Sequence, residues 1–429
     1  MQVVVGGGII GLSVAWRLAR AGRPVTVVDP APASGASHAA AGMLAPVSEV
    51  TYTEEPLLRL GMAALRRWPS FAADLIADAG LPTTGLARPA PGPCAEGGPG
   101  PRAGVLGSSA LPTAEAGGLD LRSDGTLDVA FGADDLAALD ELATFMEKLG
   151  LPVERLTGRE CRRLEPMLAP SVRGGVLAPG DAWVDPRRVT AALLVALERR
   201  GVPLVRARVT ELIREGGAVT GVRLAPPGPP ETTPGHGVPT AIGPGHGVPA
   251  EIPGGGDVPG EIRAERVVLA AGAWSAELAE VPVRPVKGQI MRLRSPQPLL
   301  GRCVRGTVHG ASVYLVPRGD GELVVGATQE ELGFDRRVTA GGVYELLRDA
   351  RELVPGVTEL EVAEMVAGLR PGTPDNVPLI GPSATPGLHL ATGHHRGGVL
   401  LAPLTAAMLQ GEESELAQLC SPLRYRDIS

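Results

Sequence analysis

The sequence predicts an α/β fold in which a Rossmann-like, doubly wound domain is interleaved with a second domain built on a mixed or antiparallel sheet. Two observations predict this architecture. A buried strand, a glycine-rich turn and an apolar helix follow one another near each end of the chain, within residues 1–30 and 389–409. Between them, several segments alternate apolar and polar residues as antiparallel strands do. At 429 residues the chain exceeds what one hydrophobic core normally supports, so we expect two or three domains.

The first element is a strand followed by a helix, in MQVVVGGGIIGLSVAWRLARAGRPVTVVDP. A run of valines predicts a strand that is buried on both faces. Apolar side chains then recur at helical spacing, at Ile10, Val14 and Leu18. Gly22 ends this helix, and PVTVVD predicts a second strand. The order strand, turn, helix and strand is typical of a nucleotide-binding βαβ unit.

The turn between the strand and the helix has the pattern G-x-G-x-x-G, formed by Gly6, Gly8 and Gly11. Because glycine has no side chain, these positions allow a tight turn, let the backbone approach a diphosphate, and let the helix pack closely on the strand. The helix directs its free N–H groups and the positive end of its dipole at the ligand. Asp29 ends the second strand, where its carboxylate can accept hydrogen bonds from ribose hydroxyls. The pattern predicts a dinucleotide site, and by itself it does not distinguish FAD from NAD.

The next segment, SGASHAAAGMLAPVSE, is rich in small residues at 34–36 and 39–42. A backbone with so few side chains can lie against a flat ring system. Met43 projects from this backbone. The segment therefore favours a cofactor with a large planar ring.

A second turn of this kind lies near the carboxyl end, in HLATGHHRGGVLLAPLTAAML. Gly393, Gly397 and Gly398 allow close approach of the backbone to a ligand, and a helix from about Val399 directs its positive end there. Arg396 belongs to the same turn and is a candidate to pair with cofactor or substrate. The two neighbouring histidines have no acidic or cysteine partners at ligand spacing, so we expect no metal.

Two further residues, an arginine and a tyrosine, are notable for their places in predicted strands. Arg370, in GLRPGTPDN, lies at the end of a predicted strand beside a stiff turn, and a guanidinium binds a carboxylate through two parallel hydrogen bonds. On local sequence alone, a structural salt bridge is the commoner role for such an arginine. Tyr314, in VYLVPR, lies within a predicted strand, and its ring faces either a cavity or the hydrophobic core.

The remaining regular segments complete the two domains. A helix is predicted at 186–201 and a strand at 202–216, both in the nucleotide-binding half. The second domain takes predicted strands at 122–131, 286–294, 312–318 and 321–329 and predicted helices at 134–150 and 343–356. Two stretches rich in Pro, Gly and Ala, residues 86–120 and 226–262, predict flexible insertions because they hold few large apolar side chains. The second contains an imperfect ten-residue repeat and separates two strands that would otherwise form a hairpin.

Composition excludes several classes of protein. The 40 basic and 47 acidic side chains give a net charge of −7, with no basic cluster suited to nucleic acid. The four cysteines form no C-x-x-C pair, which argues against a zinc ribbon or a disulfide framework. No apolar run reaches the roughly 18 residues that a membrane span needs, and no signal peptide is evident. We expect a soluble, cytoplasmic protein.

Several blocks, in this order, make the chain resemble the D-amino acid oxidase superfamily of flavoproteins, and in particular the glycine oxidases of the thiamin pathway: VVLAAGAWS, PVRPVKGQIMRLR, VYLVPRGDGELVVGAT, GLRPGTPDNVPLIGP and LATGHHRGGVLLAP. The resemblance implies FAD and oxidation of glycine to its imine, with oxygen as electron acceptor and hydrogen peroxide as product. No cysteine occurs in the carboxyl-terminal blocks where related sarcosine oxidases attach their flavin, so FAD is expected to be noncovalent.

The resemblance also assigns residues. It implies that Arg370 holds the substrate carboxylate and that Tyr314 assists it, with Met43 and Arg396 also at the reacting site. The implied FAD-binding residues are Gly6, Gly8, Ile10, Gly11, Asp29, Ser37, His38, Ala41, Gly42, Val209, Gly272, Trp274, His394, Arg396, Gly397, Gly398, Val399 and Leu400. The implied FAD-binding domain comprises residues 1–80, 184–225, 263–281 and 365–429, and the substrate domain comprises 81–183 and 282–364.

The sequence departs from the family at three positions and leaves alternatives open. The family more often has an aromatic residue at His395, an asparagine at Gly397 and a methionine at Gln329. A sarcosine or D-amino acid oxidase or dehydrogenase of the same superfamily, an NAD-dependent dehydrogenase and a noncatalytic flavin-binding module are the alternatives. The electron acceptor and the oligomeric state, including a homo-oligomer, stay open.

Overall fold

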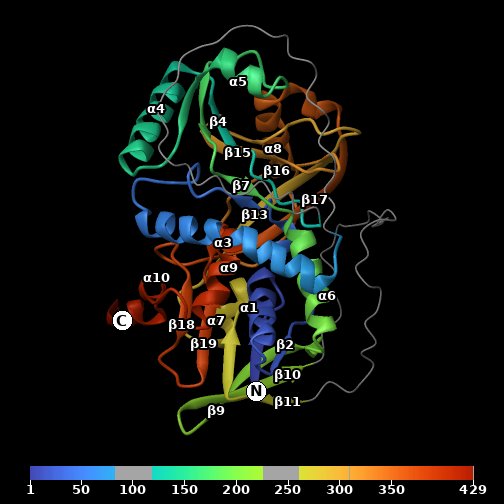
Figure 1. Cartoon of the computed structure of the whole chain (residues 1–429), viewed down its shortest axis with the longest axis vertical. Coiled ribbons are helices and arrows are strands. Elements are labelled where there is room, and N and C mark those ends of the chain that lie inside the picture. Colours follow the sequence, from blue (N-terminus) through green and yellow to red (C-terminus); the bar gives the residue numbers. More distant parts are fainter. Residues whose placement is uncertain (83–117, 226–259, 309, 429) are drawn as a thin grey trace.

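The computed structural model describes residues 1–82, 118–225, 260–308 and 310–428. Figure 1 shows one large sheet with its helices at each end of the long axis, and helix α3 (Glu55–Ala79) lying across the middle. No helix in these ranges combines the length and apolar character needed to cross a membrane.

The lower sheet in Figure 1 has six strands in the order β18-β19-β12-β1-β2-β8. Their bounds are Leu379–Pro382 (β18), Leu388–Thr392 (β19), Arg266–Leu269 (β12), Gln2–Val5 (β1), Val25–Val28 (β2) and Leu204–Val205 (β8). All neighbours pair in parallel except β18, which is antiparallel to β19. The parallel core confirms the predicted doubly wound domain.

The valines of the first two strands explain why this sheet is buried on both faces. Val4 and Val27 pack against the helices of one face, which are α1 (Ile9–Arg20), α3, α6 (Pro186–Arg199) and α9 (Gly398–Met408). Val3, Val5 and Val28 belong to a separate core on the opposite face. Alternate side chains of one strand therefore enter two different cores.

That opposite face is covered by a three-stranded antiparallel sheet, β9 (Arg208–Glu215), β10 (Ala218–Ala225) and β11 (Glu261–Arg263). The single strand predicted at 202–216 is thus two strands, β8 and β9, which lie in different sheets. Strands β10 and β11 pair directly, with Arg223 opposite Glu261, so the strands that flank the predicted second insertion do form a hairpin. Residues 261 and 262 of that insertion belong to β11, residues 226–259 lie outside the described residues, and so do residues 86–117 of the first insertion.

The upper sheet has eight strands in the order β17-β13-β16-β15-β14-β4-β6-β5. Their bounds are Glu361–Gly372 (β17), Arg284–Arg294 (β13), Glu322–Gly326 (β16), Ala311–Pro317 (β15), Cys303–Val308 (β14), Thr126–Ala130 (β4), Gly174–Ala178 (β6) and Glu154–Thr157 (β5). The pair β14 and β4 is parallel and the others are antiparallel, which confirms a mixed sheet. Helices α4 (Ala133–Lys148), α5 (Gly158–Leu164) and α8 (Ala340–Leu353) accompany it.

Short elements lie between and beside the two sheets. A two-stranded sheet joins β3 (Met43–Leu44) to β7 (Ala182–Trp183). The others are α2 (Ala36–Ala39), α7 (Ser275–Leu278), α10 (Ser414–Leu419) and the 3-10 turns η1 (Gly272–Trp274), η2 (Pro355–Glu359), η3 (His395–Gly397) and η4 (Pro422–Ile428). Strand β17 pairs with β13 along its whole length, so the predicted domain boundary at residue 365 falls inside a strand of the upper sheet.

Candidate active site

A cavity of about 1190 Å³ brings together the two glycine-rich turns and the upper sheet. Its walls come from the β1–α1 turn, α2 and β3, the end of β12, strands β13, β15 and β17, and the start of α9. This volume slightly exceeds the range of about 300–1,000 Å³ that is usual for small-molecule sites. The space therefore suits a ligand larger than a single metabolite.

The first glycine turn is shaped so that side chains are sterically excluded. Gly6 has a φ of 114°, and a Cβ at this position would lie 2.2 Å from the carbonyl oxygen of Ala270. A Cβ on Gly11 would lie 1.9 Å from the carbonyl oxygen of Gly6. Gly11 thus lets helix α1 pack directly on β1, and it does not itself line the cavity. Helix α1 begins without an acidic side chain or a side-chain cap, which leaves its positive end to a ligand.

Asp29 and Ser37 fix the backbone around this turn. The Asp29 carboxylate accepts hydrogen bonds from the N–H groups of Gly7 (2.6 Å) and Ala31 (2.7 Å). Burial raises the pKa of Asp29, and these two bonds oppose that rise. The Ser37 hydroxyl accepts a 2.9 Å bond from the N–H of Ile9 at the start of α1. Both side chains also line the cavity, as predicted.

The segment after α2 supplies free backbone donors. Ala41 and Gly42 are buried and line the cavity, yet neither N–H donates a hydrogen bond to any described residue. Gly42 has a φ of 81°, and a Cβ there would lie 2.0 Å from the carbonyl oxygen of Val184. Buried N–H groups are almost always paired in proteins. These two donors and the glycine cradle fit a bound dinucleotide with a planar ring.

The second glycine turn is held by a buried histidine. The His394 ring nitrogen Nε2 lies 2.9 Å from the Thr405 hydroxyl in α9, and burial lowers the pKa of His394 to about 3. Burial likewise lowers the pKa of His395 to about 4. Both rings are therefore neutral at neutral pH. Helix α9, like α1, begins without an acidic side chain or a side-chain cap.

Arg396 lines the cavity, and its guanidinium forms an ion pair with Glu54. Glu54 also accepts a hydrogen bond from the Asn376 side chain (2.8 Å). Burial opposes ionisation of Glu54, but the contacts with Arg396 and Asn376 outweigh it and lower its pKa. The structure thus gives Arg396 a protein partner that the sequence did not indicate.

Arg370 lines the cavity and forms no ion pair with any carboxylate in the described part of the chain. One nitrogen, Nη1, donates to the carbonyl oxygens of Thr328 (3.2 Å) and Lys287 (3.4 Å). Its other donors have no protein acceptor among the described residues. The guanidinium crosses Gly288 on β13, where a Cβ would lie 2.2 Å from Nη1. The salt-bridge alternative for Arg370 therefore does not apply here.

Tyr314 and Met43 lie in the same cavity as Arg370. Burial raises the pKa of Tyr314, with the positive charge of Arg370 opposing the rise, so the hydroxyl stays protonated and able to donate. Its ring stands over Gly326 of β16, where a Cβ would lie 2.4 Å from the hydroxyl oxygen. The Met43 sulfur lies 3.7 Å from the Cys303 thiol, at the edge of a small apolar core.

Strand β17 contacts both halves of the cavity. Gly368 faces α2, and a Cβ there would lie 2.8 Å from the Cβ of Ala39. Arg370 follows two residues later and so lies on the same face of the strand. One strand thus borders the predicted ring-binding segment and carries the predicted carboxylate-binding residue.

The structure places most of the predicted site residues on the cavity wall. Besides those already described, Gly8, Ile10, Val209, Gly272, Trp274, Gly398 and Val399 line it. Four predicted residues do not: Gly11, His38, Gly397 and Leu400. The His38 ring instead lies 3.3 Å from Glu364, and the Leu400 carbonyl accepts a hydrogen bond from the Trp68 ring nitrogen (3.0 Å). Their cofactor roles remain predictions.

Sequence reasoning missed Gly288 and the polar end of the cavity. A glycine inside a predicted strand is a sign of close approach by another group, and that sign was present in VKGQIMRLR. Glu49, Thr51, Arg305 and Ser312 also line the cavity, and none of them was among the predicted site residues. No periodicity in the sequence indicated them.

A cavity that joins a dinucleotide turn to an arginine with no carboxylate partner in the described parts of the chain is typical of a nucleotide-dependent enzyme that binds an anionic substrate. That is the class of protein which this fold and site define. The chain belongs to the FAD dependent oxidoreductase family, whose model matches residues 2–97 and 109–410.

Relatives with described activities cover nearly the whole chain. It is 32% identical over 411 residues to the bifunctional protein ThiO/ThiG of Nostoc sp., covering 95% of this chain and 51% of the relative. It is 30% identical over 415 residues to a glycine oxidase of Geobacillus kaustophilus, covering 95% of this chain and 90% of the relative. The crystal structure of glycine oxidase from Geobacillus kaustophilus superposes with a TM-score of 0.76 at 28% identity, covering 99% of this chain and 98% of that one. The chain spans about half the length of the bifunctional relatives.

Proposed function

We propose that this protein is an FAD-dependent oxidase of glycine. The single observation that carries the proposal is Arg370: its guanidinium lies in the cavity without a carboxylate partner among the described residues, and Tyr314 lines the same space. An arginine in this state is suited to a small carboxylate ligand. The glycine oxidase relatives supply the substrate assignment.

The residues of the lower sheet would hold the cofactor. The β1–α1 turn suits the diphosphate, the Asp29 carboxylate suits the ribose, and the N–H groups of Ala41 and Gly42 suit the polar edge of the ring. When bound, FAD supplies the acceptor of two electrons in the reaction. No cysteine of the described residues lines the cavity, which supports noncovalent binding.

The residues of the upper sheet would orient the substrate. Arg370 binds its carboxylate through Nη2 and Nε, which have no protein acceptor among the described residues, and the protonated Tyr314 hydroxyl donates a further hydrogen bond. Orientation of the α-carbon by these two groups supplies the proximity contribution to catalysis. This arrangement needs no protein nucleophile.

We infer further that oxygen is the electron acceptor, that hydrogen peroxide is formed and that the imine product serves thiamin biosynthesis. Support for the last inference comes from the bifunctional ThiO/ThiG relatives. We also assign residues 1–80, 184–225, 263–281 and 365–429 to the cofactor domain and 81–183 and 282–364 to the substrate domain. Residues 365–372 of strand β17 then belong by sequence to the cofactor domain and by pairing to the sheet of the substrate domain.

Anaerobic mixing tests the proposal. The FAD-loaded protein is mixed in separate runs with glycine, sarcosine and D-alanine, and the visible absorption of the flavin is followed. We expect glycine to bleach it faster than sarcosine or D-alanine at the same concentration. Faster bleaching by sarcosine or D-alanine would reassign the substrate within the superfamily, and a flavin that none of the three reduces would refute the oxidase proposal.

A further inference from the structure

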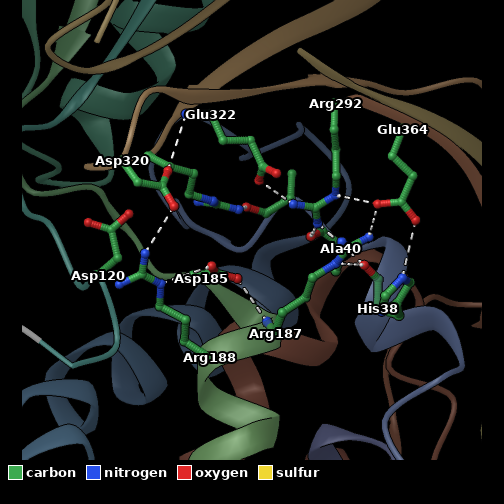
Figure 2. A network of polar contacts seen from close by, with 12 residues as sticks. His38, Ala40, Asp120, Asp185, Arg187, Arg188, Arg292, Asp320, Glu322 and Glu364 are labelled. Atoms are coloured by element: carbon green, nitrogen blue, oxygen red, sulfur yellow. Dashed lines mark hydrogen bonds and ion pairs between the residues drawn. The ribbon is translucent and has the colours of Figure 1, made fainter. Parts of the chain in front are cut away.

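A network of charged side chains, some buried and some partly exposed, connects helices α2 and α6 with strands β13, β16 and β17 of the upper sheet (Figure 2). It combines arginines and carboxylates from both halves of the molecule with the backbone of the segment after α2. The ion pairs of the network include Arg187 with Glu364 (2.7 Å), Arg292 with Glu322, and Arg188 with Asp320 (3.1 Å). Although burial opposes it, the His38 and Arg187 contacts lower the pKa of Glu364 to about 2, so this carboxylate stays ionised.

Three of the arginines also donate to backbone carbonyls of residues 38–41, which border the cavity. Arg187 donates through Nε to the carbonyl of His38 (2.9 Å). Arg292 donates through Nη2 to the carbonyls of His38 (3.3 Å) and Ala40 (3.4 Å). Arg318 donates through Nη2 to the carbonyl of Ala41. Arg292 belongs to strand β13 and Arg318 directly follows strand β15, so the substrate half of the molecule holds the backbone of the cofactor half.

Peptide geometry converts these bonds into an orientation of N–H groups. In a trans peptide the C=O and N–H bonds point in opposite directions. The Ala40 carbonyl, one of the two that Arg292 binds, belongs to the same peptide group as the N–H of Ala41. The Ala41 carbonyl, which Arg318 binds, belongs to the same peptide group as the N–H of Gly42. These are the two cavity-lining N–H groups that have no acceptor among the described residues.

Stability alone does not explain Arg318. Its side chain is 2% exposed, and its Nε and Nη1 atoms have no hydrogen-bond partner among the described residues. Burial accordingly lowers the pKa of this guanidinium. A buried arginine with unused donors destabilises a fold relative to an apolar side chain of similar volume. Among the described residues, the one hydrogen bond of the Arg318 guanidinium is to the carbonyl of Ala41.

We propose that Arg292 and Arg318 are positioning residues for the cofactor: by holding the carbonyls of Ala40 and Ala41, they direct the N–H groups of Ala41 and Gly42 at bound FAD. The cationic ends of the two side chains polarise these peptides, which strengthens the N–H groups as donors. The arrangement favours the more negatively charged, reduced form of the ring. The inference rests on the proposed placement of FAD in this cavity.

The test compares Arg292→Met and Arg318→Met with Arg188→Met. Arg188 belongs to the same network, through Asp185 (3.4 Å) and Asp320 (3.1 Å), but makes no bond to residues 38–41. All three variants remove one positive charge from the network. Comparison with Arg188→Met therefore separates the loss of the hydrogen bonds to residues 38–41 from the effect of a lost charge on FAD. The readouts are the Kd for FAD, from titration of the apoprotein, and the reduction potential of the bound flavin.

We expect Arg292→Met and Arg318→Met to weaken FAD binding about 10- to 100-fold and to lower the reduction potential, with Arg188→Met close to wild type in both. Arg292→Lys, which keeps the charge, should recover part of each loss. Values for Arg292→Met equal to those of Arg188→Met would overturn the proposal, and this comparison decides it if Arg318→Met does not fold. Because neither readout uses glycine, a failed glycine assay leaves this test intact.

Discussion

The guanidinium of Arg370 lies across the α-carbon of Gly288, on the neighbouring strand of the upper sheet. Antiparallel register places Arg370 opposite Val286 and Gly288 opposite Gly368, so the long side chain runs diagonally over the one residue that leaves it room. A Cβ at residue 288 would lie 2.2 Å from Nη1 and 2.4 Å from Nη2. The position of the proposed carboxylate-binding group thus depends on a residue that itself contacts no substrate atom through a side chain.

We therefore predict that Gly288→Ala raises the KM for glycine by at least about tenfold while the protein keeps its FAD, because the methyl group displaces the guanidinium. Steady-state kinetics and the visible spectrum of the purified variant measure the two effects. Gly341→Ala, in the exposed part of α8 with no atom near the added Cβ, is the matched control. An unchanged KM in Gly288→Ala would show that Arg370 can bind substrate from another position.

Removal of the guanidinium itself should have a larger effect. We expect Arg370→Ala to retain FAD and to weaken glycine binding by about 1.5–3 kcal/mol, the usual contribution of hydrogen bonds to charged groups. The dependence of the anaerobic reduction rate on glycine concentration gives the affinity. Arg284→Ala, on the neighbouring strand β13 opposite Gly372 and paired with Glu331, is the control. Saturation by glycine at the wild-type concentration would remove Arg370 from its assigned role.

The first glycine turn makes a prediction about the cofactor alone. Gly11→Ala should yield protein without bound FAD, because its Cβ would lie 1.9 Å from the carbonyl oxygen of Gly6 and would push α1 away from β1. The ratio of flavin absorbance to protein absorbance after purification measures this. Gly180→Ala, where no atom lies within 4 Å of the added Cβ, should keep the wild-type ratio. A yellow Gly11→Ala protein would contradict the assigned diphosphate site.

The β10–β11 hairpin predicts that the repeat-containing insertion is dispensable. The N–H of Leu224 donates to the carbonyl of Gly260 (2.9 Å), so the two chain ends are already adjacent. Replacing residues 225–259 by Asn-Gly supplies a two-residue hairpin turn of the favoured type. We expect soluble protein with wild-type FAD content and turnover. Loss of soluble protein in this variant would mean that the insertion contributes to folding.

The buried His394 predicts acid sensitivity. Its pKa is about 3 in the folded protein and 6.5 in the unfolded chain, so between these values the unfolded chain binds a proton that the folded protein excludes. Its contribution is fully present above pH 6.5 and is lost as the pH falls, by about 1.4 kcal/mol per pH unit. His394→Gln cannot ionise but can still bond to Thr405, so wild type should lose stability relative to this variant. Urea unfolding at pH 8, 6 and 5 measures the difference, and parallel losses in the two proteins would refute the assignment.

The sequence predicted the parts of the fold that depend on local pattern. The strands, glycine turns and helices at both ends of the chain were predicted because periodicity and glycine spacing are properties of one contiguous segment. Tyr314 and Arg370 came from a family resemblance, and the structure brings both to one cavity. The sequence did not indicate that the predicted domain boundary at residue 365 would fall inside β17. Pairing with β13, and not the local pattern, decides which sheet this strand joins.

The parts that depend on long-range register were not predictable. Gly288 makes room for Arg370 only because of one particular alignment of β13 with β17. The network of charged side chains joins His38, Arg187 and Glu364, which are far apart in sequence and follow no motif. His394 lines the cavity, and its cofactor role stays a prediction, but the contact of its ring with Thr405 in α9 was not predicted. Such partners become visible only when the segments are placed in space.

Strand β17 also bears on the substrates that the proposed oxidase could accept. Gly368, against the ring-binding segment, and Arg370, at the carboxylate end, are two residues apart on one face of one strand, about 7 Å along its axis. Because residues 368 and 370 lie on the same strand, the distance between them stays the same if the two sheets move relative to each other. On the proposed function, Arg370 binds the substrate carboxylate, and only the carbon next to that carboxylate then lies at the ring. In β-alanine and longer ω-amino acids the carbon that carries the amine is farther from the carboxylate, so it would lie beyond the place where oxidation occurs.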